Sequence, residues 1–133
     1  YIEATNDRFD GVVIDACDAQ GLIRAFAAPD RLIAAMAILR PGSPLIVNLV
    51  GPNGAPDYAW PLACAIAARG VNATLHRAED GWEGNEILHV CADRFAPALD
   101  AKDLQHRPPE VRTYLMSLRA YPVVPNHAAR LAR

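Results

Sequence analysis

The chain has little net charge and no long apolar run, and each absence excludes a class of partner. Its 133 residues carry a formal net charge of −2, and the basic residues are dispersed except for Arg130 and Arg133. This balance provides no basic patch for a phosphate backbone, so nucleic acid is not an expected partner. No apolar run approaches the ~20 residues needed to cross a bilayer, so no membrane partner is expected either.

Motifs for metal ligation and for nucleophilic catalysis are also missing. The three cysteines, Cys17, Cys64 and Cys91, are far apart and lack metal-ligand spacing, so no metal site is predicted. Unpaired thiols are most simply placed in the cytoplasm. No serine lies in a glycine elbow. The one lysine, Lys102, lies in a polar stretch beyond the predicted sheet, which disfavours a receiver-type phosphoacceptor.

The most informative segment is an apolar run that ends in two carboxylates. Val12, Val13 and Ile14 are β-branched and continuously apolar, as expected of a parallel strand covered on both faces by helices. Functional groups gather at the carboxyl ends of such strands, where Asp15 and Asp18 are expected. Two unpaired carboxylates suit a cation, or a site in which one acid is a general base. In the structural alternative, Asp15 caps a turn and Asp18 begins a helix.

Strand and helix signals alternate along the chain, which is typical of βαβ units around a parallel sheet. Helices are expected over residues 29–39, 57–70 and 110–119, and further strands over residues 45–50, 71–77 and 86–92. The connector between the last two strands is too short for a crossover helix, so these strands should pair antiparallel. The expected domain, or part of one, covers residues 1–120 and is followed by an extended tail over 121–133.

The segment Asp15-Ala16-Cys17-Asp18-Ala19-Gln20-Gly21 resembles the spermidine synthase family, in which a strand is followed by Asp, two small or aromatic residues, a second Asp and a glycine. The resemblance continues through Arg40-Pro41-Gly42 to Gly51, and then fades. It implies that Asp15 accepts the proton of an attacking amine and that Asp18 holds the amine. Asn48 lies near a strand-end Gln of the family, so it either binds the substrate or forms a turn.

The resemblance also implies a fold and a reaction. The fold is α/β, the second half of a three-layer, Rossmann-like, methyltransferase-type sheet, with parallel strands closed by an antiparallel hairpin. Its four strands correspond to the family's fourth to seventh. The reaction is aminopropyl transfer from decarboxylated S-adenosylmethionine to an amine such as putrescine, with no tightly bound cofactor. The family's glycine-rich donor loop has no counterpart here, so the chain is expected to be the carboxyl-terminal half of a larger protein.

Two alternatives stay open. One is an S-adenosylmethionine-dependent methyltransferase on the same scaffold, in which the acid pair holds another nucleophile. The other is a noncatalytic module that dimerises, because a half-sheet exposes an apolar strand edge that another chain must cover. The expected partners are therefore a small-molecule amine, and either a second copy in a homo-oligomer or the missing amino-terminal half.

Overall fold

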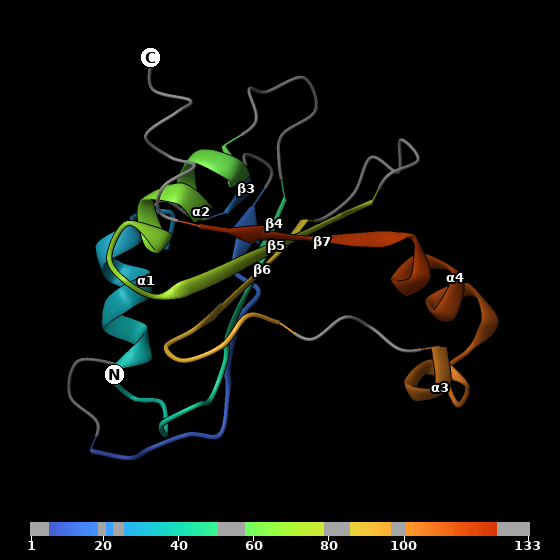
Figure 1. Cartoon of the computed structure of the whole chain (residues 1–133), viewed down its shortest axis with the longest axis horizontal. Helices are drawn as coiled ribbons and strands as arrows, with labels where there is room; N and C mark the ends of the chain where they lie inside the picture. The colour runs from blue at the N-terminus through green and yellow to red at the C-terminus, as the bar shows by residue number, and fades with distance from the viewer. Residues whose placement is uncertain are drawn as a thin grey trace.

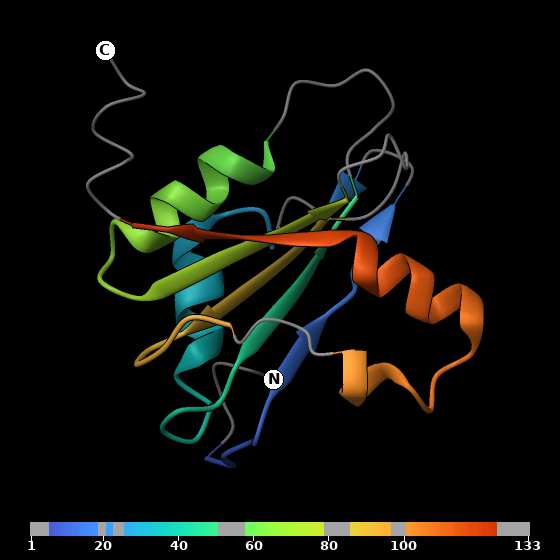
Figure 2. The same cartoon turned by 45° about the vertical axis from the view of Figure 1, so that its right-hand side comes forward.

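The computed structural model describes residues 6–18, 21–22, 26–50, 58–78, 86–96 and 101–124. Its elements are β1 (Val12–Ile14), β2 (Cys17–Asp18), β3 (Gly21–Leu22), α1 (Pro29–Met36), β4 (Leu45–Leu49), α2 (Ala59–Ala67), β5 (Asn72–Ala78), β6 (Glu86–Cys91), α3 (Ala101–Leu104), α4 (Pro109–Ser117) and β7 (Leu118–Val123). The fold is α/β. Helices α1 and α2 lie on one side of a five-stranded sheet, and α3 and α4 lie on the other (Figure 1, Figure 2).

The five-stranded sheet is mixed, and its strand order is β1-β4-β6-β5-β7. β1 and β4 are parallel, whereas β6 lies antiparallel between β4 and β5. The predicted antiparallel pairing of the strands over 71–77 and 86–92 is therefore confirmed. Within the described residues β1 pairs with β4 alone, so it forms one edge of the sheet, and β7 forms the other.

β7 is absent from the elements predicted from the sequence, and the helix expected over 110–119 ends earlier than predicted. α4 stops at Ser117, and β7 begins at Leu118 without a connecting loop. Among the described strands β7 pairs with β5 alone, and an edge strand tolerates a proline such as Pro122. Residues 121–123, expected in the tail, therefore belong to the sheet, and Val123 is buried in the core.

The helices α1 and α2 lie close to where the sequence predicts them. α1 begins at Pro29, whose fixed φ and missing N–H suit a first helical turn, and it ends three residues before the predicted end at Leu39. The predicted start of α2, Asp57, lies outside the described residues. Gly70 follows α2 with a φ of +84°, a left-handed conformation typical of glycine after a helix. None of the described helices has the length and apolar composition needed to span a membrane.

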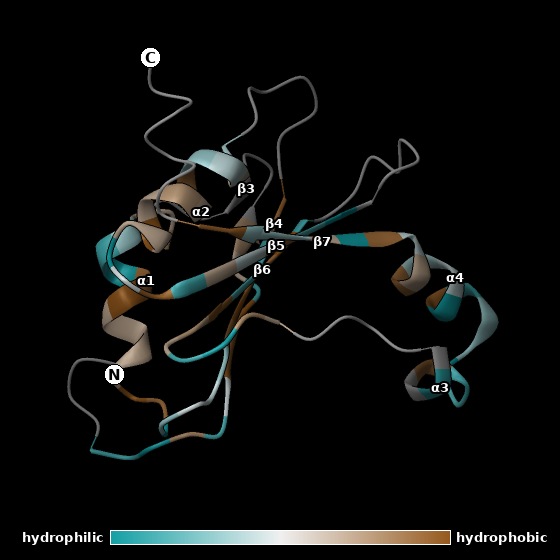
Figure 3. Cartoon of the chain, in the orientation of Figure 1, coloured by the Kyte–Doolittle hydropathy of each residue, from teal (hydrophilic) through white to brown (hydrophobic). Residues whose placement is uncertain are grey.

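Successive side chains of a strand point to opposite sides, which gives the sheet two different faces. One packs against α1 and α2, and Figure 3 shows apolar residues along much of α2. This helix-covered face includes the buried residues Ile14, Leu45, Val47, Leu49, Leu75, Leu88 and Val90. The opposite face, called the pocket face below, carries Val13, Ile46, Asn48, His76, Ile87 and His89.

Val13 corrects the expectation that helices cover both faces of β1. Its relative exposure is 69%, whereas that of Ile14 is 6%. A continuously apolar strand exposes every second side chain unless a helix lies on each face. Among the described helices, α4 reaches the pocket face next to β1, through Tyr114. Most of the Val13 side chain stays exposed.

Candidate functional site

Asp15 and Asn48 meet at the carboxyl ends of two adjacent parallel strands. Asp15 directly follows β1, and Asn48 is the last residue but one of β4. The parallel register pairs Ile14 with Val47, so the two residues that follow also lie side by side. Asn48 Nδ2 donates a hydrogen bond of 2.7 Å to Asp15 Oδ1. Because Asn48 lies within β4, the turn-forming alternative for this residue is wrong.

A pocket of about 280 Å³ lies beside this pair. It is lined by Val13, Asp15, Ile46, Asn48, Ile87 and Tyr114. The three aliphatic residues come from neighbouring strands of the pocket face, and the tyrosine comes from α4. The pocket therefore has one polar end and apolar walls, and Asp15 is exposed to whatever enters it.

Among the described residues, Asp15 forms no ion pair with a cationic side chain. Asp10 pairs with Arg40, Asp30 with Arg69 and Glu86 with Arg77, all outside the pocket. Asp93 accepts a hydrogen bond of 3.1 Å from the Cys91 thiol. A carboxylate with no cation beside it, at the mouth of a pocket, is suited to bind a cationic ligand.

Asp18 belongs to β2, where it lies opposite Gly21 of β3. Its backbone is therefore extended, and the alternative in which Asp18 begins a helix is wrong. The Asp18 side chain lies outside the described part of the structure, so its convergence with Asp15 stays a prediction. The neighbouring Cys17 thiol donates a hydrogen bond of 3.5 Å to the Asn48 carbonyl oxygen, which ties the β2–β3 hairpin to the end of β4.

The second polar atom of the Asn48 amide has no partner within the described residues. Oδ1 is buried and accepts no hydrogen bond there. A buried acceptor left without a donor costs about 1–3 kcal/mol, so such atoms are normally satisfied by protein, water or ligand.

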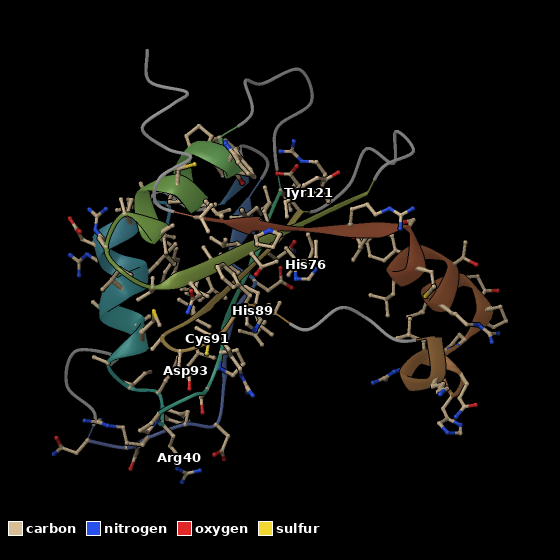
Figure 4. The ribbon with its side chains drawn as sticks, in the orientation of Figure 1. Arg40, His76, His89, Cys91, Asp93 and Tyr121 are labelled. Carbon is tan, nitrogen blue, oxygen red and sulfur yellow. The ribbon has the colours of Figure 1, made fainter. Side chains whose placement is uncertain are left out.

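His76 and His89 lie on the pocket face beyond the apolar walls (Figure 4). The sheet register places His76 opposite Ile87 and His89 opposite Ile46. Burial lowers the pKa of His76, and the charge of His89 lowers it further. Burial also lowers the pKa of His89, with an added effect of the Arg94 charge. Among the described residues, no three His, Cys, Asp or Glu side chains are placed to hold a metal ion.

The remaining chemically notable groups lie away from the pocket. The Tyr58 hydroxyl donates a hydrogen bond of 2.9 Å to the Val50 carbonyl oxygen, which joins the start of α2 to the end of β4. Burial raises the pKa of the Cys64 thiol in α2. Cys91 ends β6 and Asp93 follows it, and both lie toward Arg40 and away from His76 (Figure 4). Trp82 and His127 lie outside the described residues.

Several pocket residues were not predicted from the sequence as site residues. A signal existed for Ile46, because it precedes Asn48 by two positions, and alternation places both on one face of β4. Tyr114 has no such local signal, since α4 is joined directly to β7, a strand that was not predicted.

Comparison of the chain with protein-family models, with curated proteins and with solved structures gave no match. The resemblance to spermidine synthases around Asp15 therefore stays a prediction from the sequence. The structure adds to this motif the contact between Asp15 and Asn48 and the pocket beside them.

Proposed function

We propose that the protein is a spermidine synthase-like transferase, which moves an aminopropyl group from decarboxylated S-adenosylmethionine to an amine in the cytoplasm. The observation that carries this proposal is the Asp15–Asn48 hydrogen bond of 2.7 Å beside a pocket of about 280 Å³. Asn48 engages one carboxylate oxygen and so orients the other, Oδ2, for the amine. In this proposal Asp18 holds the same substrate.

The chemistry of an amine nucleophile explains the need for a carboxylate. An alkylamine has a pKa near that of lysine, about 10, so it is almost wholly protonated at neutral pH. Asp15 binds the ammonium and accepts its proton as nitrogen attacks the donor carbon next to the sulfonium. The C–N bond forms while the C–S bond breaks, and its electron pair passes to sulfur. The neutral thioether leaves, and the proton passes from Asp15 to solvent.

The sheet supports the same family assignment. The resemblance implies four strands that include an antiparallel hairpin. The sheet contains four such strands, β1, β4, β5 and β6, and β5 and β6 form the hairpin. β7 is an addition to that pattern. The Rossmann-like, methyltransferase-type description of the fold is part of this proposal, and no donor-binding residue is assigned.

The transfer step is tested by incubating the protein with decarboxylated S-adenosylmethionine and an alkylamine, and detecting the N-aminopropyl product by mass spectrometry. Asp15→Asn keeps the size of the side chain but removes the base, so turnover should fall by about 10²–10⁴-fold. Asp10→Asn, an exposed carboxylate outside the pocket, is the matched control and should keep full turnover. Undiminished turnover in Asp15→Asn contradicts the assignment. Parallel reactions with S-adenosylmethionine test the methyltransferase alternative.

The exposed edge of the sheet favours a second candidate, a noncatalytic module that pairs with another chain. β1 pairs with β4 alone among the described strands, and Val13 beside this edge is 69% exposed. An uncovered apolar strand edge is a template for association. Sedimentation velocity over a wide concentration range tests this candidate, and a monomer at every concentration contradicts it.

A further inference from the structure

We propose that α4 is a lid that closes over the pocket when an amine binds at Asp15. This inference rests on the proposed function, and it concerns access to the same site. α4 borders the pocket through Tyr114. The helix is described in full, and none of its nine residues is buried. A helix this short is marginal in water without tertiary packing, so closer packing on the sheet would stabilise it.

The coverage of α4 decreases along the helix, away from β7. Val111, Tyr114 and Leu115 lie on one face, because they are three and four residues apart. Tyr114 and Leu115 are half-buried, whereas Val111, one turn earlier, is 42% exposed. Figure 2 shows the helix running outward from the start of β7. The carboxyl-terminal end of α4 therefore lies close to the sheet, while its amino-terminal end stands away from it.

Exposed apolar side chains lie on both sides of the pocket. Val13 of β1 lines the pocket and is 69% exposed. Val111 of α4 shares a face with Tyr114, which lines the pocket from the other side. A rotation of α4 toward β1 moves Val111 toward Val13 and over an alkyl chain bound between them. Apolar surface of the helix, the strand and the ligand then leaves water, which favours the closed state.

The junction of α4 with β7 is suited to act as the hinge. β7 is held by its pairing with β5. The backbone changes from helical at Ser117 to extended at Leu118, where φ is −73° and ψ is 128°. A change in a few dihedral angles at such a junction redirects a whole helix. At the other end of α4, residues 105–108 are all exposed, so no packing of these side chains opposes the movement.

Closure depends on the amine because the amine fills the pocket. Without a ligand, closing α4 over about 280 Å³ leaves either a void or water against apolar walls, and both are unfavourable. With an alkylamine in place, closure removes water from around Asp15 and the ammonium group. Their attraction is stronger in the lower dielectric that results, so the closed lid retains the substrate.

The experiment is an NMR titration of the full chain with n-hexylamine and with 1,4-diaminobutane, in which methyl signals of Ile46, Val111 and Met116 are followed. Ile46 lines the pocket and reports binding. Val111 and Met116 lie outside the pocket lining and are 42% and 46% exposed, but Met116 is not on the face of Tyr114. We expect the Val111 signals to shift with the same Kd as those of Ile46, and the Met116 signal to stay unchanged.

Two matched variants test whether α4 takes part in binding. Val111→Asn removes apolar surface from the closed lid and should weaken amine binding about three- to tenfold. Met116→Asn makes a similar change on another face of α4 and should keep full affinity. Urea unfolding without ligand should give both variants nearly the same stability, because both side chains are exposed. If Val111→Asn does not fold, the methyl signals of the unmodified chain decide.

The possible results separate the lid from the amine site. Equal amine affinities of the two variants, or unchanged Val111 signals while those of Ile46 shift, overturn the lid and leave the amine site intact. No shift of the Ile46 signals with either amine overturns the proposed function as well.

Discussion

The two faces of the sheet are built from alternate residues of the same strands and differ in what their side chains do. On β4, Leu45 and Val47 are fully buried against the helices, whereas Ile46 and Asn48 are half-buried and line the pocket. Because neighbouring residues of a strand point to opposite sides, stability and ligand binding are assigned to positions one residue apart. Paired substitutions on one strand can therefore separate the two roles.

The largest effect is the difference in the free energy of unfolding that is expected between Leu45→Ala and Ile46→Ala. Leu45 has no exposed surface, so its truncation leaves a cavity under the helices and should lower the free energy of unfolding by about 2–5 kcal/mol. Ile46 is partly exposed, and its truncation should cost about 1 kcal/mol but weaken n-hexylamine binding several-fold. Urea unfolding and the amine titration measure the two effects. Equal stability losses contradict the distinction between the faces.

A smaller effect is expected from Asn48→Ala, which removes the hydrogen bond to Asp15. Asp15 then loses the group that orients its carboxylate, so amine affinity should fall about tenfold with little change in stability, because this hydrogen bond is exposed to solvent. Asn72→Ala is the matched control, since Asn72 Nδ2 donates an exposed hydrogen bond to the Ala92 carbonyl oxygen far from the pocket. An equal loss of amine affinity in both variants contradicts a positioning role for Asn48.

The pocket face should also make stability depend on pH. Burial holds the pKa of His76 and His89 below the ordinary value of 6.5, so the unfolded chain takes up protons that the folded chain does not. The free energy of unfolding should therefore be unaffected by these groups above pH 6.5 and decrease as the pH falls below it. Between pH 7.5 and 5.5 the Tm should fall by a few degrees more in the unmodified chain than in the His76→Gln/His89→Gln double variant.

The control for this pH dependence is His106→Gln, because His106 is exposed. Its Tm should fall with decreasing pH as much as that of the unmodified chain. If Tm depended on pH in the same way in the double variant and in the unmodified chain, His76 and His89 would not be the cause of the loss of stability at low pH.

The smallest change in the free energy of unfolding is expected from a substitution on the outer surface of α1 and α2. Arg69 and Asp30 form an ion pair of 2.6 Å between the end of α2 and the start of α1, and most of the Asp30 side chain is exposed. Exposed ion pairs contribute little, so Asp30→Asn should lower the free energy of unfolding by about 0.5 kcal/mol or less. A loss as large as that of Leu45→Ala would mean that this ion pair, rather than the buried face, holds the helices on the sheet.

The parts of the fold that follow from local pattern were predictable. The apolar run of Leu45 to Leu49 indicated a buried strand, Pro29 marked the start of α1, and the short connector predicted the antiparallel β5–β6 pair. β7 was not predicted, because residues 118–119 were assigned to a helix and residues 121–123 to an extended tail, with no signal for the pairing with β5. Its Pro122 is tolerated because β7 is an edge strand among the described strands. Whether a strand lies at an edge depends on how the whole sheet assembles, and the residues of the strand do not show it.

The candidate site was predictable in part. Asp15 was predicted from its place after an apolar strand and Asn48 from the family resemblance, but the hydrogen bond between them was not predicted. The apolar walls were less predictable. Val13 was expected to be buried because it is apolar and lies in an apolar strand. It is exposed because no described helix covers that part of the pocket face. Tyr114 reaches the pocket through the long-range placement of α4.

The Asp15 carboxylate should bind the cationic end of a substrate in this pocket. A titration of n-hexylamine into the unmodified chain, Asp15→Asn and Asp10→Asn, with the amide signals of Val13, Ile46 and Ile87 followed by NMR, tests this binding. We expect saturable shifts of these signals in the unmodified chain and in Asp10→Asn, and a loss of binding of about tenfold or more in Asp15→Asn. Equal binding by all three proteins would contradict it.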